Sequence, residues 1–273
     1  GGRVKTWSAK DDLEAAQTRA NVEIVTLSDL SELEDARRVF DAVWPSRTGS
    51  KQIQSNLLKA LVHAGGYAAA AYRDDRPVAA ALAFVGRHRQ PDTGDWHTHL
   101  HSHMAAVLPE SRDQHIGSAL KKHQRWWALE VGIDTVVWTF DPLVRRNAVL
   151  NLVKLGVDVE GFEVDFYGPM DDEINVGDPS DRLFAWWRLN SERAVAAAQG
   201  LQTRLDSTEM ILGGRDVIEI ELPVDIVGLR ASDSAAAAQW RVAVREALVA
   251  AFADGYRIVG VSATDSYVLE RKT

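Results

Sequence analysis

Hydrophobic positions along the chain switch repeatedly between the spacing of strands and the spacing of helices. Short apolar and β-branched runs predict strands, which we place at 22–27, 67–72, 78–85, 99–108, 133–140, 157–166 and 183–189. Apolar residues three and four positions apart predict helices, which we place at 28–43, 51–63, 116–131 and in a segment that ends at Leu155. Strands that alternate with helices in this way predict an α+β (α/β) fold with a mixed sheet.

Two polar stretches interrupt this pattern. RDDRP, at 73–77, separates two apolar runs with turn-forming residues, so it predicts a hairpin. The stretch 86–95 is polar and contains Pro91 and Gly94, and we expect a loop there.

The composition changes after Asn190. An Ala-rich and then polar stretch precedes a β-α-β-β pattern, whose segments we place at 217–222, 235–253, 256–263 and 266–271. Because such a set is too small to bury a large core alone, we expect it to pack on the rest of the chain. The predicted organisation is an N-terminal segment at 1–20, a main domain at 21–190 and a C-terminal subdomain at 191–273.

Charge and cysteine content exclude several classes of protein. The chain has 31 Lys and Arg against 39 Asp and Glu, a formal net charge of −8, so we expect no nucleic-acid partner. It has no cysteine, which excludes disulfides, thiolate nucleophiles and Cys-ligated zinc and fits a reducing cytoplasm. Since the chain also lacks a signal-peptide pattern and an apolar run of ~20 residues, we expect a cytoplasmic protein without a membrane partner.

A strand, a short polar turn and a helix follow one another in HSHMAAVLPESRDQHIGSALKKHQ, residues 101–124. The first turn of a helix has unpaired backbone N–H groups and a partial positive charge, so it is a ready site for phosphate. Arg112, Gln114 and Gly117 suit such a site, since a small side chain lets a ligand approach the backbone. From these residues alone, an anion-binding turn and a purely structural turn both remain open.

The same segment resembles the coenzyme A motif of the GNAT acyltransferases, (Q/R)-x-x-G-x-(G/A), with Arg112 as its first position and Gly117 as its last. The Val-x-Pro-Glu before it, the Ala-Leu-Lys after it and RNAVLNLVKLG at 146–156 are similar to the family's surroundings of this motif. Over most of 97–190 the chain also resembles one predicted GNAT subfamily with a C-terminal extension. The resemblance implies a mixed, mostly antiparallel central sheet flanked by helices.

The resemblance further implies an acyl-CoA-dependent N-acyltransferase, in which the amine of a small molecule attacks the thioester of acetyl-CoA, or of a related acyl-CoA, directly. The residues implied to bind this co-substrate are Ala105, Ala106, Val107, Arg112, Asp113, Gln114, His115, Ile116, Gly117, Ser118 and Asn147. Two positions depart from the family pattern. His115 replaces the first glycine of the motif, and Leu152 replaces the tyrosine that protonates the leaving thiolate, a role for which we consider Tyr167.

Four histidines precede the motif. His97, His99, His101 and His103 alternate along the sequence, so a strand would place all four on one face. We consider His101 and His103 as general bases for the attacking amine; the alternative is that they are partly buried, hydrogen-bonded histidines. Imidazoles on one face can also bind zinc, but no carboxylate partner accompanies them, so we expect no metal.

Three functions remain open at this point. The first is an acetyltransferase that acts on a small-molecule amine. The second is an amino-acid N-succinyltransferase, which the subfamily resemblance implies. Arg145 and Arg146 would then bind either the additional carboxylate or the phosphates of CoA. The third is a non-catalytic CoA-binding sensor, because His115 and Leu152 depart from the family pattern. The C-terminal subdomain is expected to cap the acceptor site or to form a homodimer contact.

Overall fold

The structure, a computed structural model, describes residues 8–89, 93–168 and 178–271. The chain forms two compact units, and the described residues pass from the first unit to the second between Val137 and Trp138. This division falls within a strand, whereas the sequence predicted a boundary near Asn190. A separate C-terminal subdomain at 191–273 therefore stays a prediction.

The first unit contains the predicted coenzyme A motif at 112–117, called the cradle below, and the strand that carries the four histidines. Its elements are, in chain order, α1 (Ala9–Ala20), β1 (Glu23–Thr26), α2 (Leu30–Val43), α3 (Ser55–His63), β2 (Tyr67–Arg73), β3 (Arg76–Arg89), β4 (Trp96–Val107), the 3₁₀ turn η1 (Pro109–Ser111), α4 (Ile116–Glu130) and the first half of β5 (Thr135–Phe140). Antiparallel pairing joins β1, β2, β3 and β4 in that order. β4 pairs in parallel with β5 through Leu100–Val136 and His101–Val137.

Helices cover both faces of the β1–β4 sheet. On one face the strands bury small side chains against the apolar residues of α2 and α3, a cluster that includes Leu33, Phe40, Leu58, Ala68, Ala70, Ala80, Leu82 and Ala106. On the other face Tyr67 packs against α4, with its ring centroid 5.1 Å from that of Trp127. The alternation of Tyr67 and Ala68 between the two faces is the period of two that a strand imposes.

The hairpin of β3 and β4 is longer than the sequence predicted. The expected loop at 86–95 was wrong in its first part, because β3 continues to Arg89 and pairs His88 with His97. β4 already begins at Trp96. Cross-strand contacts between polar side chains sustain the ladder here, and such contacts leave no apolar signal in the sequence.

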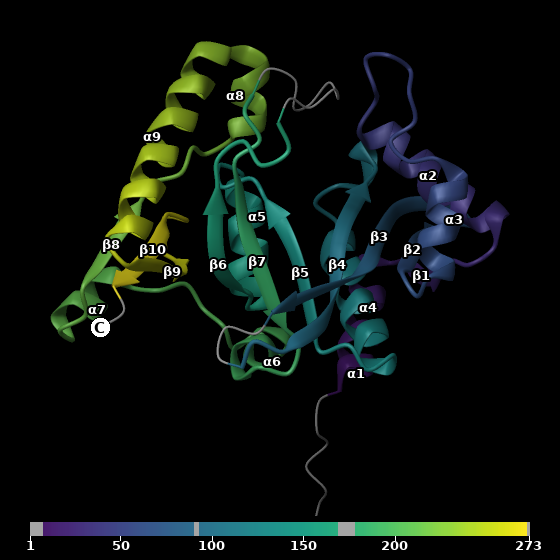
Figure 1. The fold of residues 1–273 in the computed structure, drawn as a ribbon, viewed down its shortest axis with the longest axis horizontal. Helices are drawn as coiled ribbons and strands as arrows, with labels where there is room; N and C mark the ends of the chain where they lie inside the picture. The colour runs from purple at the N-terminus through teal and green to yellow at the C-terminus, as the bar shows by residue number, and fades with distance from the viewer. Residues whose placement is uncertain (1–7, 90–92, 169–177, 272–273) are drawn as a thin grey trace, which may run out of the picture. The chain divides into compact units, whose positions relative to one another are not determined.

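The described part of the N-terminal segment forms α1, which packs on α4 (Figure 1). Ser8 caps α1 by accepting a hydrogen bond from the Asp11 backbone N–H at 3.1 Å. Asp12 is buried, and its carboxylate contacts Lys122 and lies 3.9 Å from a guanidinium nitrogen of Arg125. This buried ion pair fixes α1 against the helix that begins at the cradle.

The second unit contains the remaining elements. After the end of β5 these are α5 (Arg145–Val149), the π-helical turn η2 (Leu150–Leu155), β6 (Asp158–Glu163), β7 (Arg182–Arg188), α6 (Glu192–Ala198), α7 (Ser207–Leu212), β8 (Val217–Ile220), α8 (Ile226–Ser232), α9 (Ser234–Ala253), β9 (Tyr256–Val261) and β10 (Tyr267–Arg271). β6 pairs antiparallel with β7, and β8, β10 and β9 form a second antiparallel sheet in that order. The predicted C-terminal strands and long helix are confirmed, while α6, α7 and α8 were not predicted.

Buried ion pairs organise the second unit around the end of β5. Arg241 donates to both carboxylate oxygens of Asp141 at 3.0 Å and also binds Asp178. Burial alone would raise the pKa of Asp141, but the guanidinium groups of Arg241 and Arg230 lower it below its ordinary value. Asp141, directly after β5, is therefore anchored from α9.

The predicted fold class is confirmed. The chain has a mixed, mostly antiparallel sheet flanked by helices, with β4–β5 as the parallel pair described above. Among the described helices, none combines the length and the apolar character needed to cross a membrane.

Candidate active site

The turn that precedes α4 has an unusual backbone. Asp113 and His115 adopt positive φ angles of 60° and 63°, a left-handed conformation that non-glycine residues rarely adopt. His115 is the N-cap of α4, and its carbonyl accepts from the Ala119 N–H at 3.1 Å. None of the described hydrogen bonds is donated by the backbone N–H groups of 113–118. The turn thus presents a series of available donors at the positive end of a fifteen-residue helix.

The space beside this turn fits a phosphate-bearing ligand. A Cβ added at Gly117 would meet only one side-chain atom within 4 Å, Cγ2 of Val107, at 3.9 Å. The backbone at the start of α4 is therefore approachable, and the end of β4 lies directly beside it. Ala105, Ala106 and Val107 form this end of β4 and pair with Ala79–Ala81 of β3. The role of Ala105, Ala106 and Val107 in binding an acyl-CoA stays a prediction. Arg112 is half-buried at the start of the turn.

The four histidines lie on one face of the β3–β4 hairpin. His88 of β3 packs against the rings of His97 and His99, and Phe84 packs against those of His101 and His103. Gly86, between them on β3, has no side chain because the His99 ring occupies the space, where an added Cβ would lie 2.6 Å from Nε2. The alternation in the sequence therefore predicted the shared face correctly.

The two candidate bases differ in their surroundings. Burial, followed by the charges of His103, His99 and Lys121, lowers the pKa of His101 to about 4. His103 is more exposed, and desolvation lowers its pKa as well. Their ring centroids are 6.1 Å apart. Both imidazoles are neutral near pH 7, the state a proton acceptor needs, and the more accessible His103 is the better placed to meet an amine.

His97 and His99 have other partners. His97 Nε2 lies 3.0 Å from Asp134, and His99 Nδ1 lies 2.9 Å from His88 Nδ1. These contacts make His97 and His99 structural members of the hairpin. Within the described ranges, no group of three or more His, Cys, Asp or Glu side chains is arranged to hold a metal ion.

A buried lysine lies next to this strand and was not singled out from the sequence. Lys121 of α4 donates to the Ser102 hydroxyl on β4 at 2.9 Å and to the Gln124 side-chain oxygen at 3.2 Å. Burial lowers its pKa to about 7. The Ala-Leu-Lys sequence gives no sign of this, because an α-helical period does not reveal which polar residue faces the sheet.

The remaining predicted site residues belong to the second unit. The Tyr167 hydroxyl lies 2.9 Å from the Thr139 hydroxyl, and the guanidinium of Arg182 lies 5.4 Å from the Tyr167 ring centroid. Asn147 is half-buried in α5. Leu152, where the family has a tyrosine, is completely buried in the core and has no acid–base chemistry. The roles of Asn147 and Tyr167 beside a bound acyl-CoA stay predictions.

Residues 30–156 match the model of the acetyltransferase (GNAT) family. No curated protein sequence matches the chain. Among solved structures, the chain is similar to an N-acetyltransferase from Staphylococcus aureus Mu50, with 17% identity, a TM-score of 0.43, and coverage of 62% of this chain and 99% of that one. It is also similar to the ribosomal-protein-S18-alanine N-acetyltransferase from Escherichia coli, with 14% identity, a TM-score of 0.45, and coverage of 63% and 97%.

A further similar structure is Arabidopsis thaliana Naa50 in complex with the bisubstrate analogue CoA-Ac-MVNAL, with 16% identity, a TM-score of 0.44, and coverage of 60% and 97%. The family match extends from α2 to the end of the π-helical turn and includes the cradle and all four histidines of β4. The chain therefore carries a GNAT-family acetyltransferase domain at 30–156 and is an N-acyltransferase of the GNAT type, a family whose co-substrate is an acyl-CoA.

Proposed function

We propose that the chain is a cytoplasmic enzyme and that it transfers the acetyl group of acetyl-CoA to the amine of a small molecule. The observation that carries the proposal is the turn before α4, where the backbone N–H groups of 113–118 are available and Gly117 leaves room beside them. Residues 105–107 and 112–118, together with Asn147, would hold the co-substrate. Acetyl-CoA would supply an acetyl thioester, from which the CoA thiolate leaves readily.

The chain's own residues would position the reactants and handle one proton. The amine nitrogen forms a bond to the thioester carbon, the carbon–sulfur bond breaks, and the proton lost by the amine balances the one gained by the thiolate. His103, exposed and neutral at pH 7, is our first choice as acceptor of the amine proton, with His101 behind it on the same face. Tyr167 is the proposed donor to the thiolate. Most of the rate enhancement would come from positioning.

The acyl chain and the acceptor can be tested together. We expect release of free CoA thiol when the protein is given acetyl-CoA and a panel of small amines that includes amino acids. If succinyl-CoA were used instead, Arg145 and Arg146 would become candidates for binding its carboxylate, and the N-succinyltransferase would replace our proposal. Arg146 is exposed, while Arg145 donates to the Leu222 carbonyl.

A valine at the cradle makes the test specific. Gly117→Val should lower kcat/KM for acetyl-CoA about tenfold or more, ~1.4 kcal/mol, mainly through KM, because its methyl groups enter the space beside the turn. Glu130→Val, at the exposed far end of the same helix, should leave KM unchanged. Absence of CoA binding in calorimetry would refute the proposal. Binding without turnover on any acceptor would favour the non-catalytic sensor.

A further inference from the structure

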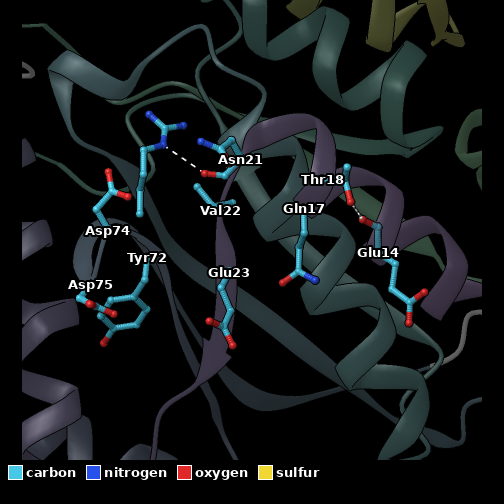
Figure 2. Close-up of a pocket in the computed structure, with 10 residues that line it drawn as sticks. Glu14, Gln17, Thr18, Asn21, Val22, Glu23, Tyr72, Asp74 and Asp75 are labelled. Carbon is cyan, nitrogen blue, oxygen red and sulfur yellow. Dashed lines mark hydrogen bonds between the residues drawn. The ribbon is translucent and has the colours of Figure 1, made fainter.

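Arg73, a residue outside the motif, is hydrogen-bonded to the cradle. Arg73 ends β2, directly before the Asp74–Asp75 turn, in which both residues have positive φ angles. It lines a pocket of about 570 Å³ between α1 and this turn, which Figure 2 shows with Asn21 and Tyr72 among the lining residues. The tight turn fixes where the strand ends, and so fixes the origin of the Arg73 side chain.

The guanidinium of Arg73 joins three separate parts of the first unit. Its Nε donates to the Asn21 carbonyl at 3.1 Å, and one terminal nitrogen donates to the Ala20 carbonyl at 2.8 Å. These are carbonyls at the C-terminal end of α1, which otherwise lack helical partners. The other terminal nitrogen donates to the side-chain oxygen of Gln114 at 2.6 Å.

Gln114 transmits this anchor to the cradle backbone. Its side-chain nitrogen donates to the Glu110 carbonyl at 3.2 Å, so the amide spans the turn from η1 to the start of α4. Gln114 lies between Asp113 and His115, the two residues with positive φ. Non-glycine residues keep such a conformation only where surrounding contacts determine it. The bonds of Gln114 to Glu110 and to Arg73 are contacts of this kind.

We infer that Arg73 is a positioning residue of the acyl-CoA site, which acts through Gln114 to hold the N–H groups of 113–118 in their binding arrangement. The effect of Arg73 on ligand binding rests on the proposed function, in which the ligand of this turn is acyl-CoA. The positioning effect does not come from the charge of Arg73 alone. Gln114 is neutral, and its removal should weaken the site in a similar way.

Calorimetric titration with CoA tests the coupling. We expect Arg73→Ala and Gln114→Ala each to weaken CoA binding about tenfold, about 1.4 kcal/mol at 25 °C. The double variant should bind nearly as well as either single variant, because both remove the same connection. Arg76→Ala, an exposed arginine in the same turn, is the matched control and should bind CoA like the wild type. Full affinity in Gln114→Ala, or additive losses in the double variant, would overturn the inference.

A ligand-free measurement separates this inference from the proposed function. The ¹⁵N order parameters of 112–118 should fall from about 0.85 to below about 0.6 in Arg73→Ala and in Gln114→Ala, but not in Arg76→Ala. If the wild type does not bind CoA while these order parameters fall as expected, the proposed function fails and the positioning role stands. If they are unchanged in both variants, the positioning role is wrong whether or not CoA binds.

Discussion

His115 occupies a backbone position that the family gives to glycine. Its φ of 63° costs an L-residue about 1–2 kcal/mol, and His tolerates this region better than most residues do. We expect His115→Gly to change the free energy of unfolding by less than about 1 kcal/mol, because relief of strain offsets the greater entropy of the unfolded chain. His115→Val should lower the free energy of unfolding by about 1–2 kcal/mol, since a β-branched side chain fits this backbone conformation worst. Urea denaturation measures both.

The control for this prediction lies on the same helix. Glu130→Val places the same side chain at an exposed position with ordinary helical geometry, and should cost about 0.5 kcal/mol from helix propensity. Equal losses in His115→Val and Glu130→Val would mean that the positive φ angle of His115 carries no strain.

At the residue scale, the sequence reveals what depends on local spacing. The departures at His115 and Leu152 could be read directly from the motif, and the structure gives their physical basis in a left-handed N-cap and a filled core. Arg73 and Lys121 could not be found in this way. Their importance comes from partners distant in sequence, Gln114 for the first and Ser102 for the second, which only the folded sheet brings near.

At the element scale, the docking of α1 depends on one buried carboxylate. Asp12 is 2% exposed and pairs with Lys122 and Arg125 of α4. We expect Asp12→Asn to lower the free energy of unfolding by about 3 kcal/mol, because removal of one member leaves buried positive charge without its partner. Glu14→Gln removes an exposed carboxylate from the same helix and should change it by less than about 0.5 kcal/mol. A loss below about 1 kcal/mol in Asp12→Asn would show that the pair does not hold α1.

Helices and strands could be predicted where apolar residues recur at the spacing of the element. The strands and helices with strong apolar spacing, such as α4 and β5, were placed within a few residues of their observed ends. α1 was missed because most of its residues are polar and few apolar positions mark its buried face. The spacing of Ser8 and Asp11 is nevertheless that of a capping box. The distal part of the β3–β4 hairpin was missed because histidine contacts, rather than apolar residues, hold it.

At the scale of the whole molecule, acid should affect the two units differently. In the first unit, burial lowers the pKa of His99, His101 and His123 to about 4 in each case, with neighbouring charges adding to the effect at His99 and His101. Unfolded histidines have a pKa near 6.5, so below that pH the unfolded state binds more protons than the native state. The stability these groups contribute is therefore complete above pH 6.5 and decreases as the pH falls toward 4.

The second unit is held by pairs that persist in this range. Arginine partners lower the pKa of Asp141, so the stability it contributes is complete above the ordinary carboxyl pKa and is lost only as the pH falls through the lowered value. We therefore expect acidification from pH 7 to pH 5 to expose residues 8–137 to hydrogen exchange before residues 138–271. Mass spectrometry of peptides from the two units measures this order directly.

One buried histidine gives this prediction a quantitative test. His123 is 2% exposed, and its Nδ1 lies 2.8 Å from the Tyr67 hydroxyl. Between the plateau above pH 6.5 and pH 5, the contribution of one neutral buried histidine to the free energy of unfolding should fall by about 2 kcal/mol. His123→Gln keeps a polar partner for Tyr67 without a titrating group, so it should reduce the first unit's loss of stability by about that amount. If the pH dependence of the variant equals that of the wild type, proton uptake by His123 in the unfolded chain does not drive the acid sensitivity of this unit.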